Sequence, residues 1–148
     1  MMMSLQRLLD RGRLRRLPPA SSEVADLLRV VERDLTDARI EALSADRRFA
    51  TAYNAALQLA TVVLRAEGYR TQGVAHHHTT IEALPLILGV EVAETADYLD
   101  ACRSRRNTVD YDGIGIATEA DVQELLREAE ALRVAVSGWL KSAHPELA

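Results

Sequence analysis

Apolar residues recur every three or four positions along most of this chain, the spacing that places side chains on one face of an α-helix. The first long stripe follows Ser21 and Ser22, which can cap a helix, and it comprises Val24, Leu27, Leu28, Val31, Leu35, Ala38 and Leu43. The second follows a turn at residues 44–46, ends before Gly68, and comprises Phe49, Tyr53, Ala56, Leu57, Ala60, Val63 and Leu64. The first half of the chain therefore predicts two long helices.

The second half of the chain continues the helical spacing in three further segments. Thr79 or Thr80 can cap a short helix that contains Pro85, so this helix is expected to be kinked or broken, with residues 69–78 forming the loop before it. A fourth helix follows the apolar stripe Val92, Ala96, Leu99 and Cys102. The last helix begins at Thr118, where Asp121 completes an approximate capping box.

These segments predict an all-α protein, an antiparallel four- to five-helix up-down bundle, because short connections favour antiparallel neighbours. No alternating run of strand length competes with the helical pattern. The 148 residues, of which 48% are hydrophobic and 27% charged, suit a single globular core. Residues 1–20 are expected to form an arginine-rich N-terminal arm that ends at two prolines and packs on the body or on a partner. Residues 21–148 form the predicted bundle.

Charge and cysteine content narrow the classes of function. The formal net charge of −4 gives no global basic field, so any RNA site would have to be local. The single cysteine, Cys102, cannot form an internal disulfide. No apolar run approaches the roughly 20 residues that a membrane span needs, and we therefore expect no membrane contact and a cytoplasmic protein.

The strongest candidate for chemistry is a cluster of arginines, Arg103, Arg105 and Arg106, at the C-terminal end of the fourth predicted helix. Guanidinium groups at that end suit the helix dipole and can pair with Asp110, Asp112 and helix carbonyls. The same groups can hold phosphate oxygens in a bidentate manner, which would make an anion site. Both interpretations remain open from residue type alone.

The helical order, the segment Thr79-Thr-Ile-Glu-Ala-Leu84 and the segment Tyr98-Leu-Asp-Ala-Cys-Arg-Ser-Arg-Arg-Asn-Thr-Val-Asp-Tyr-Asp112 resemble HEPN domain proteins over residues 22–140. The resemblance implies a four- or five-helix bundle that dimerises. It also implies a metal-independent ribonuclease, often the toxin of a toxin–antitoxin pair. The family signature is an arginine, a polar residue such as asparagine, and a histidine after four to six intervening positions. Arg106 and Asn107 match its first half.

The second half of the signature departs from the family, because Tyr111 stands where the histidine is expected. Proton transfer near neutral pH favours a group with a pKa near 7, whereas tyrosine titrates near 10. The resemblance therefore implies a homodimer whose Arg106, Asn107 and Tyr111 face an interface cleft and bind RNA or a nucleotide. This would be a toxin–antitoxin-type or regulatory component with weak or absent ribonuclease activity. The alternative is a non-catalytic interaction module that recruits a partner such as a nucleotidyltransferase.

His76, His77 and His78 form the second candidate cluster. Consecutive histidines in a loop point apart, and no cysteine or further histidine lies at ligand spacing, so we expect neither a metal nor another cofactor. If their loop lies beside Arg106, one histidine could supply the missing base. We therefore take His78, together with Arg103 and Arg105, as expected ligand-binding residues.

Overall fold

The computed structural model describes residues 3–112 and 117–148, with side chains up to residue 106 and again from residue 117. Six α-helices occur in these ranges: α1 (Leu5–Asp10), α2 (Ser21–Ala38), α3 (Ala45–Ala66), α4 (His76–Leu88), α5 (Ala93–Asp112) and α6 (Glu119–Ala143). Short elements complete the description: strands β1 (Leu14–Arg16) and β2 (Tyr69–Thr71), and the 3₁₀ turns η1 (Val90–Val92) and η2 (Pro145–Leu147).

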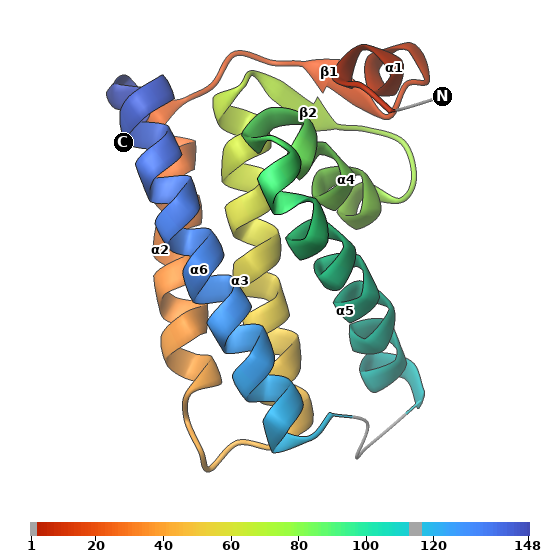
Figure 1. The fold of residues 1–148 in the computed structure, drawn as a ribbon, viewed down its shortest axis with the longest axis vertical. Helices are drawn as coiled ribbons and strands as arrows, with labels where there is room; N and C mark the ends of the chain where they lie inside the picture. Colours follow the sequence, from red (N-terminus) through yellow and green to blue (C-terminus); the bar gives the residue numbers. More distant parts are fainter. Residues whose placement is uncertain (1–2, 113–116) are drawn as a thin grey trace.

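The four longest helices, α2, α3, α5 and α6, run alternately down and up the molecule (Figure 1). Helix α3 is central and packs against α2, α4, α5 and α6. Its small residues Ala52, Ala55, Ala56 and Ala60 are buried and allow these close approaches. The predicted all-α antiparallel bundle is confirmed, with α4 placed between α3 and α5.

The N-terminal arm packs on the body of the same chain. Strand β1 pairs antiparallel with β2, with Leu14 opposite Thr71 and Arg16 opposite Tyr69 (Figure 1). Leu8 and Leu14 are fully buried in a second small core with Leu64. This ribbon was not predicted from the sequence, because three residues are too few to display a strand's alternating pattern.

Helix α4 begins one turn earlier than predicted. It starts at His76, after Ala75 in a left-handed conformation with φ of 60°. Thr79 and Thr80 are buried inside the helix instead of capping it, and the Thr80 hydroxyl donates to the His76 carbonyl at 2.8 Å. This hydrogen bond to the carbonyl four residues earlier is one that helical backbone allows, and the predicted loop is wrong over residues 76–78. The helix is not broken at Pro85 but ends at Leu88.

The other helix boundaries follow the predicted caps closely. The Ser44 hydroxyl accepts from the Arg47 amide at 3.1 Å, and Thr118 and Asp121 form a complete capping box. Gly68 follows α3 with φ of 88°, a conformation that glycine adopts without strain. Helix α2 begins at Ser21 itself, so neither predicted serine caps it by a side-chain hydrogen bond.

Candidate anion-binding site

One face of α5 carries Asp100, Arg103 and Arg106, because residues three apart in a helix lie on the same side. This face meets the first turn of α4. His78 Nδ1 donates to Asp100 Oδ1 at 3.0 Å, and Arg103 Nε donates to the same oxygen at 2.9 Å. Burial raises the pKa of Asp100, but the hydrogen bonds from His78 and Arg103 outweigh it and leave the pKa lowered. Asp100 therefore stays ionised and ties α4 to α5.

His77 lies beside the two arginines of this face. Partial removal of its ring from water lowers the pKa of His77, and the positive charges of Arg106 and Arg103 lower it further. The imidazole is consequently neutral at pH 7 and can accept a proton or a hydrogen bond. Its ring contacts the Tyr53 ring, with centroids 6.2 Å apart and planes inclined by 44°.

Tyr53 of α3 forms the floor of this cluster. Its side chain is 1% exposed, and its hydroxyl has no hydrogen-bond partner among the side chains and backbone that the structure describes. Burial raises the pKa of Tyr53, while the charges of Arg103 and Arg106 act in the opposite direction. A buried hydroxyl without a partner costs about 1–3 kcal/mol, and this hydroxyl is closed off from solvent.

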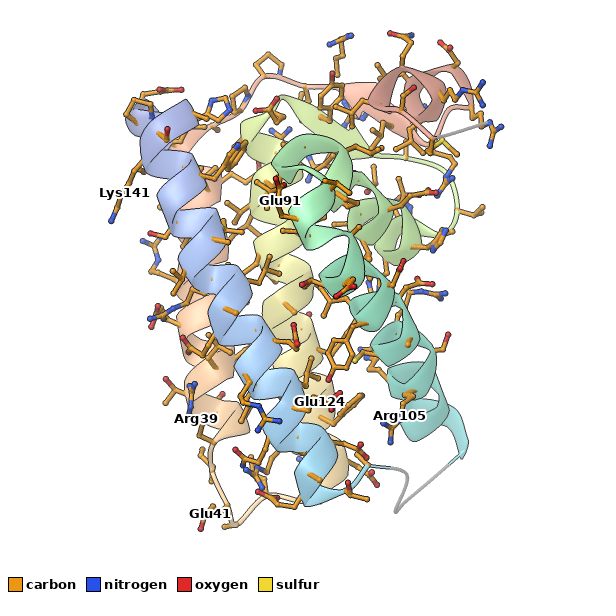
Figure 2. All side chains as sticks on the ribbon, viewed as in Figure 1. Arg39, Glu41, Glu91, Arg105, Glu124 and Lys141 are labelled. Carbon is orange, nitrogen blue, oxygen red and sulfur yellow. The ribbon has the colours of Figure 1, made fainter. Side chains whose placement is uncertain are left out.

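Arg105 lies on a different side of α5. Its Nη2 donates to Asp121 Oδ2 at 2.7 Å, and its guanidinium lies over the Phe49 ring at 5.2 Å. Figure 2 shows Arg105 on the side of α5 that faces α6. The hydrogen bond from Arg105 is the largest cause that lowers the pKa of Asp121. Arg105 thus joins α5 to α6, whereas Arg103 and Arg106 lie toward α4.

Cys102 also faces the packed side of α5. Its side chain is 3% exposed, and burial raises the pKa of the thiol to about 11. This confirms the interpretation of Cys102 as a small core residue in the apolar stripe of its helix. A thiol in this environment stays protonated at neutral pH and is a poor nucleophile.

The structure brings together two of the six predicted site residues, Arg103 and His78, which both donate to Asp100, and Arg106 lies one turn further along the same face of α5. Arg105 is held apart from them by its ion pair with Asp121. Asn107 and Tyr111 belong to α5, but their side chains lie outside the described residues, as do those of Asp110 and Asp112. The expected pairing of the arginines with those two aspartates therefore has no described counterpart.

Two residues of the cluster, His77 and Tyr53, were not among the predicted site residues. The signal for His77 was present in the sequence. Successive residues of a helix differ by about 100° around its axis, so one of three consecutive histidines at a helix start must face the neighbouring helix. Tyr53 was assigned to the core because its position fits the apolar stripe. Only its unpartnered hydroxyl distinguishes it from the other core residues of that stripe.

Metal sites and membrane-spanning helices are both absent from residues 3–112 and 117–148. The described side chains contain no group of three or more His, Cys, Asp or Glu residues that could hold a metal ion. In the same part of the chain, no helix is long and apolar enough to cross a membrane.

The fold and the cluster together define a class, an all-α bundle protein with arginines gathered on one face of a helix. Comparison with protein families then gives a more specific assignment. The model of the SAV_6107-like HEPN family matches residues 39–137, about two thirds of the chain. The chain belongs to this HEPN family, which confirms the resemblance found in the sequence. No curated protein and no solved structure matches the chain.

Proposed function

We propose that this protein is a regulatory or toxin-like component that binds RNA through the phosphate backbone at Arg103, Arg106 and His77. The observation that carries the proposal is the meeting of α4 and α5 at Asp100, which accepts hydrogen bonds from His78 and Arg103, with Arg106 one turn further along the same face of α5. Arginine suits a phosphodiester because its planar fork offers paired donors.

The same arrangement supports weak, metal-independent cleavage of the bound RNA. In that reaction His77 takes the proton of a ribose 2′-hydroxyl while the 2′-oxygen forms a bond to phosphorus. The bond from phosphorus to the 5′-oxygen breaks, and that oxygen takes a proton from water. Arg103 and Arg106 stabilise the negative charge that develops on the phosphate. A histidine of lowered pKa is a competent base at neutral pH, which compensates for Tyr111 at the signature position.

Fluorescence anisotropy with a labelled single-stranded RNA tests the binding proposal. Arg106→Ala is expected to weaken binding about 10-fold or more, since a charge-assisted hydrogen bond contributes about 1.5–3 kcal/mol. The slope of log affinity against log salt should also become shallower by about 0.7 for each lost phosphate contact. Arg29→Ala is the matched control, because Arg29 is an exposed arginine of α2 that pairs with Asp26. Equal affinities for wild type, Arg106→Ala and Arg29→Ala would contradict the proposal.

Cleavage is tested separately, with a mixed labelled RNA pool in the presence of a chelator. Wild type is compared with Arg106→Ala, His77→Asn and Tyr111→Phe. We expect cleavage by wild type and Tyr111→Phe and none by the other two variants. If no preparation cuts RNA that it binds, the protein is a binding component and His77 contributes only to affinity.

The proposal includes a homodimer, as is common for HEPN domains. Light scattering of wild type and Arg106→Ala separates a role in the interface from a role in binding the ligand. A dimer in both preparations, with affinity lost only in the variant, assigns Arg106 to the ligand. A monomeric Arg106→Ala protein assigns it to the interface.

A second candidate function is a non-catalytic module that recruits a protein such as a nucleotidyltransferase. The observation that favours it is an apolar groove of about 710 Å³ between α2 and α6, with Leu28, Gly138 and Val134 among its lining residues. Val134 is 72% exposed. Val134→Glu is expected to abolish binding of a purified nucleotidyltransferase without changing RNA affinity. Unchanged binding would remove the groove from consideration.

A further inference from the structure

A cavity of about 300 Å³ has His76 and His77 of α4 in its lining. It lies between α2, α3, β2 and the first turn of α4. Its lining includes Leu27 of α2, Leu57, Gln58 and Thr61 of α3, and His77 of α4. His77 therefore belongs both to the wall of this cavity and to the cluster with Arg103 and Arg106.

The lining combines apolar surface with several polar and charged groups, which include Glu23, Arg65 and Arg70 besides Gln58. Leu27 and Leu57 supply a flat apolar contact. The Thr61 hydroxyl donates to the Leu57 carbonyl at 2.9 Å, so its proton is already used. The Gln58 amide donates to Asn54 Oδ1 at 3.4 Å, the long limit for a hydrogen bond. A glutamine amide offers an adjacent donor and acceptor, the arrangement that pairs with the edge of a nucleobase.

Buried polar contacts hold the wall of the cavity in place. The Arg65 side chain is 4% exposed, and its Nε donates to Glu23 Oε1 at 2.8 Å. Its terminal nitrogens donate to the carbonyls of Leu17, Tyr69 and Pro18 at 3.0–3.1 Å. These contacts fix the ends of β1 and β2 against α3. The cavity is thus preformed, which reduces the entropic cost of binding a ligand.

We infer that this cavity is a nucleobase pocket, in which Gln58 pairs with the edge of a base while His77 contacts the ribose or stacks on the base. The inference rests on the proposed function, since the phosphate attached to that nucleotide would lie at Arg103 and Arg106. RNA-binding proteins commonly recognise single-stranded bases by stacking on histidine or aromatic rings and by hydrogen bonds to base edges. The pocket would give the cluster a preference for one unpaired base.

The test compares a short single-stranded RNA with the same RNA carrying one abasic site, on wild type and Gln58→Ala. Wild type should bind the intact RNA about 3- to 10-fold more tightly than the abasic RNA, the range expected for one or two neutral hydrogen bonds with stacking. Gln58→Ala should remove most of this difference. Gln123→Ala should retain it, because Gln123 is an exposed glutamine of α6 that pairs with Glu119. If the alanine variant fails to fold, Gln58→Glu, which keeps the size of the side chain, replaces it in the same comparison.

The outcomes separate the pocket from the phosphate site. If wild type binds intact and abasic RNA equally while Arg106→Ala weakens both, the pocket is wrong and the proposed function stands. If neither RNA binds, the proposed function fails. Titration of labelled protein with free nucleosides then tests whether the pocket binds a nucleoside by itself. Chemical-shift changes at Gln58 and Thr61 would then support a nucleoside site, and their absence would overturn it.

Discussion

Two sides of α5 use arginine in different ways. Toward α6, Arg105 donates to Asp121 at 2.7 Å and covers the ring of Phe49. Toward α4, Arg103 and Arg106 lie beside His77, whose pKa they lower. Arg103 and Arg105 are two positions apart, which places them about 200° apart around the helix axis. One segment of sequence therefore supplies both a structural ion pair and a candidate binding site.

The largest expected effect concerns the apolar stripe that anchors α5 to the core, and it is measured as stability. Leu99 is 1% exposed, and Leu99→Ala should lower the free energy of unfolding by about 2–5 kcal/mol, the usual cost of such a cavity. Urea denaturation followed by circular dichroism measures this change. Asp97→Ala, at an exposed position of the same helix, is the control and should change stability by less than about 0.5 kcal/mol. Similar losses for both variants would show that α5 is not anchored by its apolar stripe.

The next prediction compares the RNA affinity of two variants, each of which lacks an arginine that pairs with one aspartate. Arg103→Ala is expected to weaken RNA binding about 10-fold, because it removes a charge-assisted phosphate contact. Arg105→Ala, whose ion pair lies toward α6, should leave RNA affinity within about twofold of wild type, a difference of under roughly 0.5 kcal/mol. Anisotropy titrations of the two variants measure both values. Equal losses in affinity would mean that the two sides of α5 are not functionally distinct.

The sequence predicted the bundle well because helices are specified by local periodicity. The stripes of α3 and α6, the Ser44 and Thr118 caps and the turn at Gly68 all depend on residues close in the chain. The β1–β2 ribbon was missed because it joins residues far apart in sequence, such as Leu14 and Thr71. No periodicity within three residues could indicate that pairing.

The candidate site was predicted only in part, for a related reason. The arginines were identified from their clustering, but the division between Arg105 and the other two depends on which helices cover α5. The start of α4 at His76 depends on burial of Thr79 and Thr80 in the core. Side-chain burial of this kind is a tertiary property. Residue types alone therefore could not select His77 over His78, or recognise the unpartnered hydroxyl of Tyr53.

A smaller effect concerns the ion pair between α5 and α6. Arg105→Ala should lower the free energy of unfolding by no more than about 1 kcal/mol, because the Arg105 side chain is 42% exposed and surface ion pairs are screened by solvent. Asp121 keeps its hydrogen bond to the Thr118 amide, so the start of α6 remains capped. The shift of the urea midpoint measures the change. A loss above about 2 kcal/mol would show that this pair carries much more of the α5–α6 contact than its exposure indicates.

The smallest effect is a pH dependence assigned to His77. Because its pKa is lowered in the free protein, the imidazole is neutral at pH 7, and a bound phosphate should favour the protonated form. RNA affinity is therefore expected to rise a few-fold as the pH falls from about 8 to about 6, near the ordinary histidine pKa. His77→Asn should flatten this rise. His144→Asn should preserve it, since His144 contacts Glu67 and the Trp139 ring instead of the cluster.

The stability of the free protein should change with pH in the opposite sense. With the native pKa of His77 below its unfolded value, the unfolded chain binds more protons between the two values. The free energy of unfolding therefore falls as the pH falls through that window, while RNA affinity rises. Urea midpoints and anisotropy at the same pH values measure the two trends. If His77→Asn retains the wild-type trends in both measurements, His77 is not the titrating group, and the α4 side of α5 loses its candidate base.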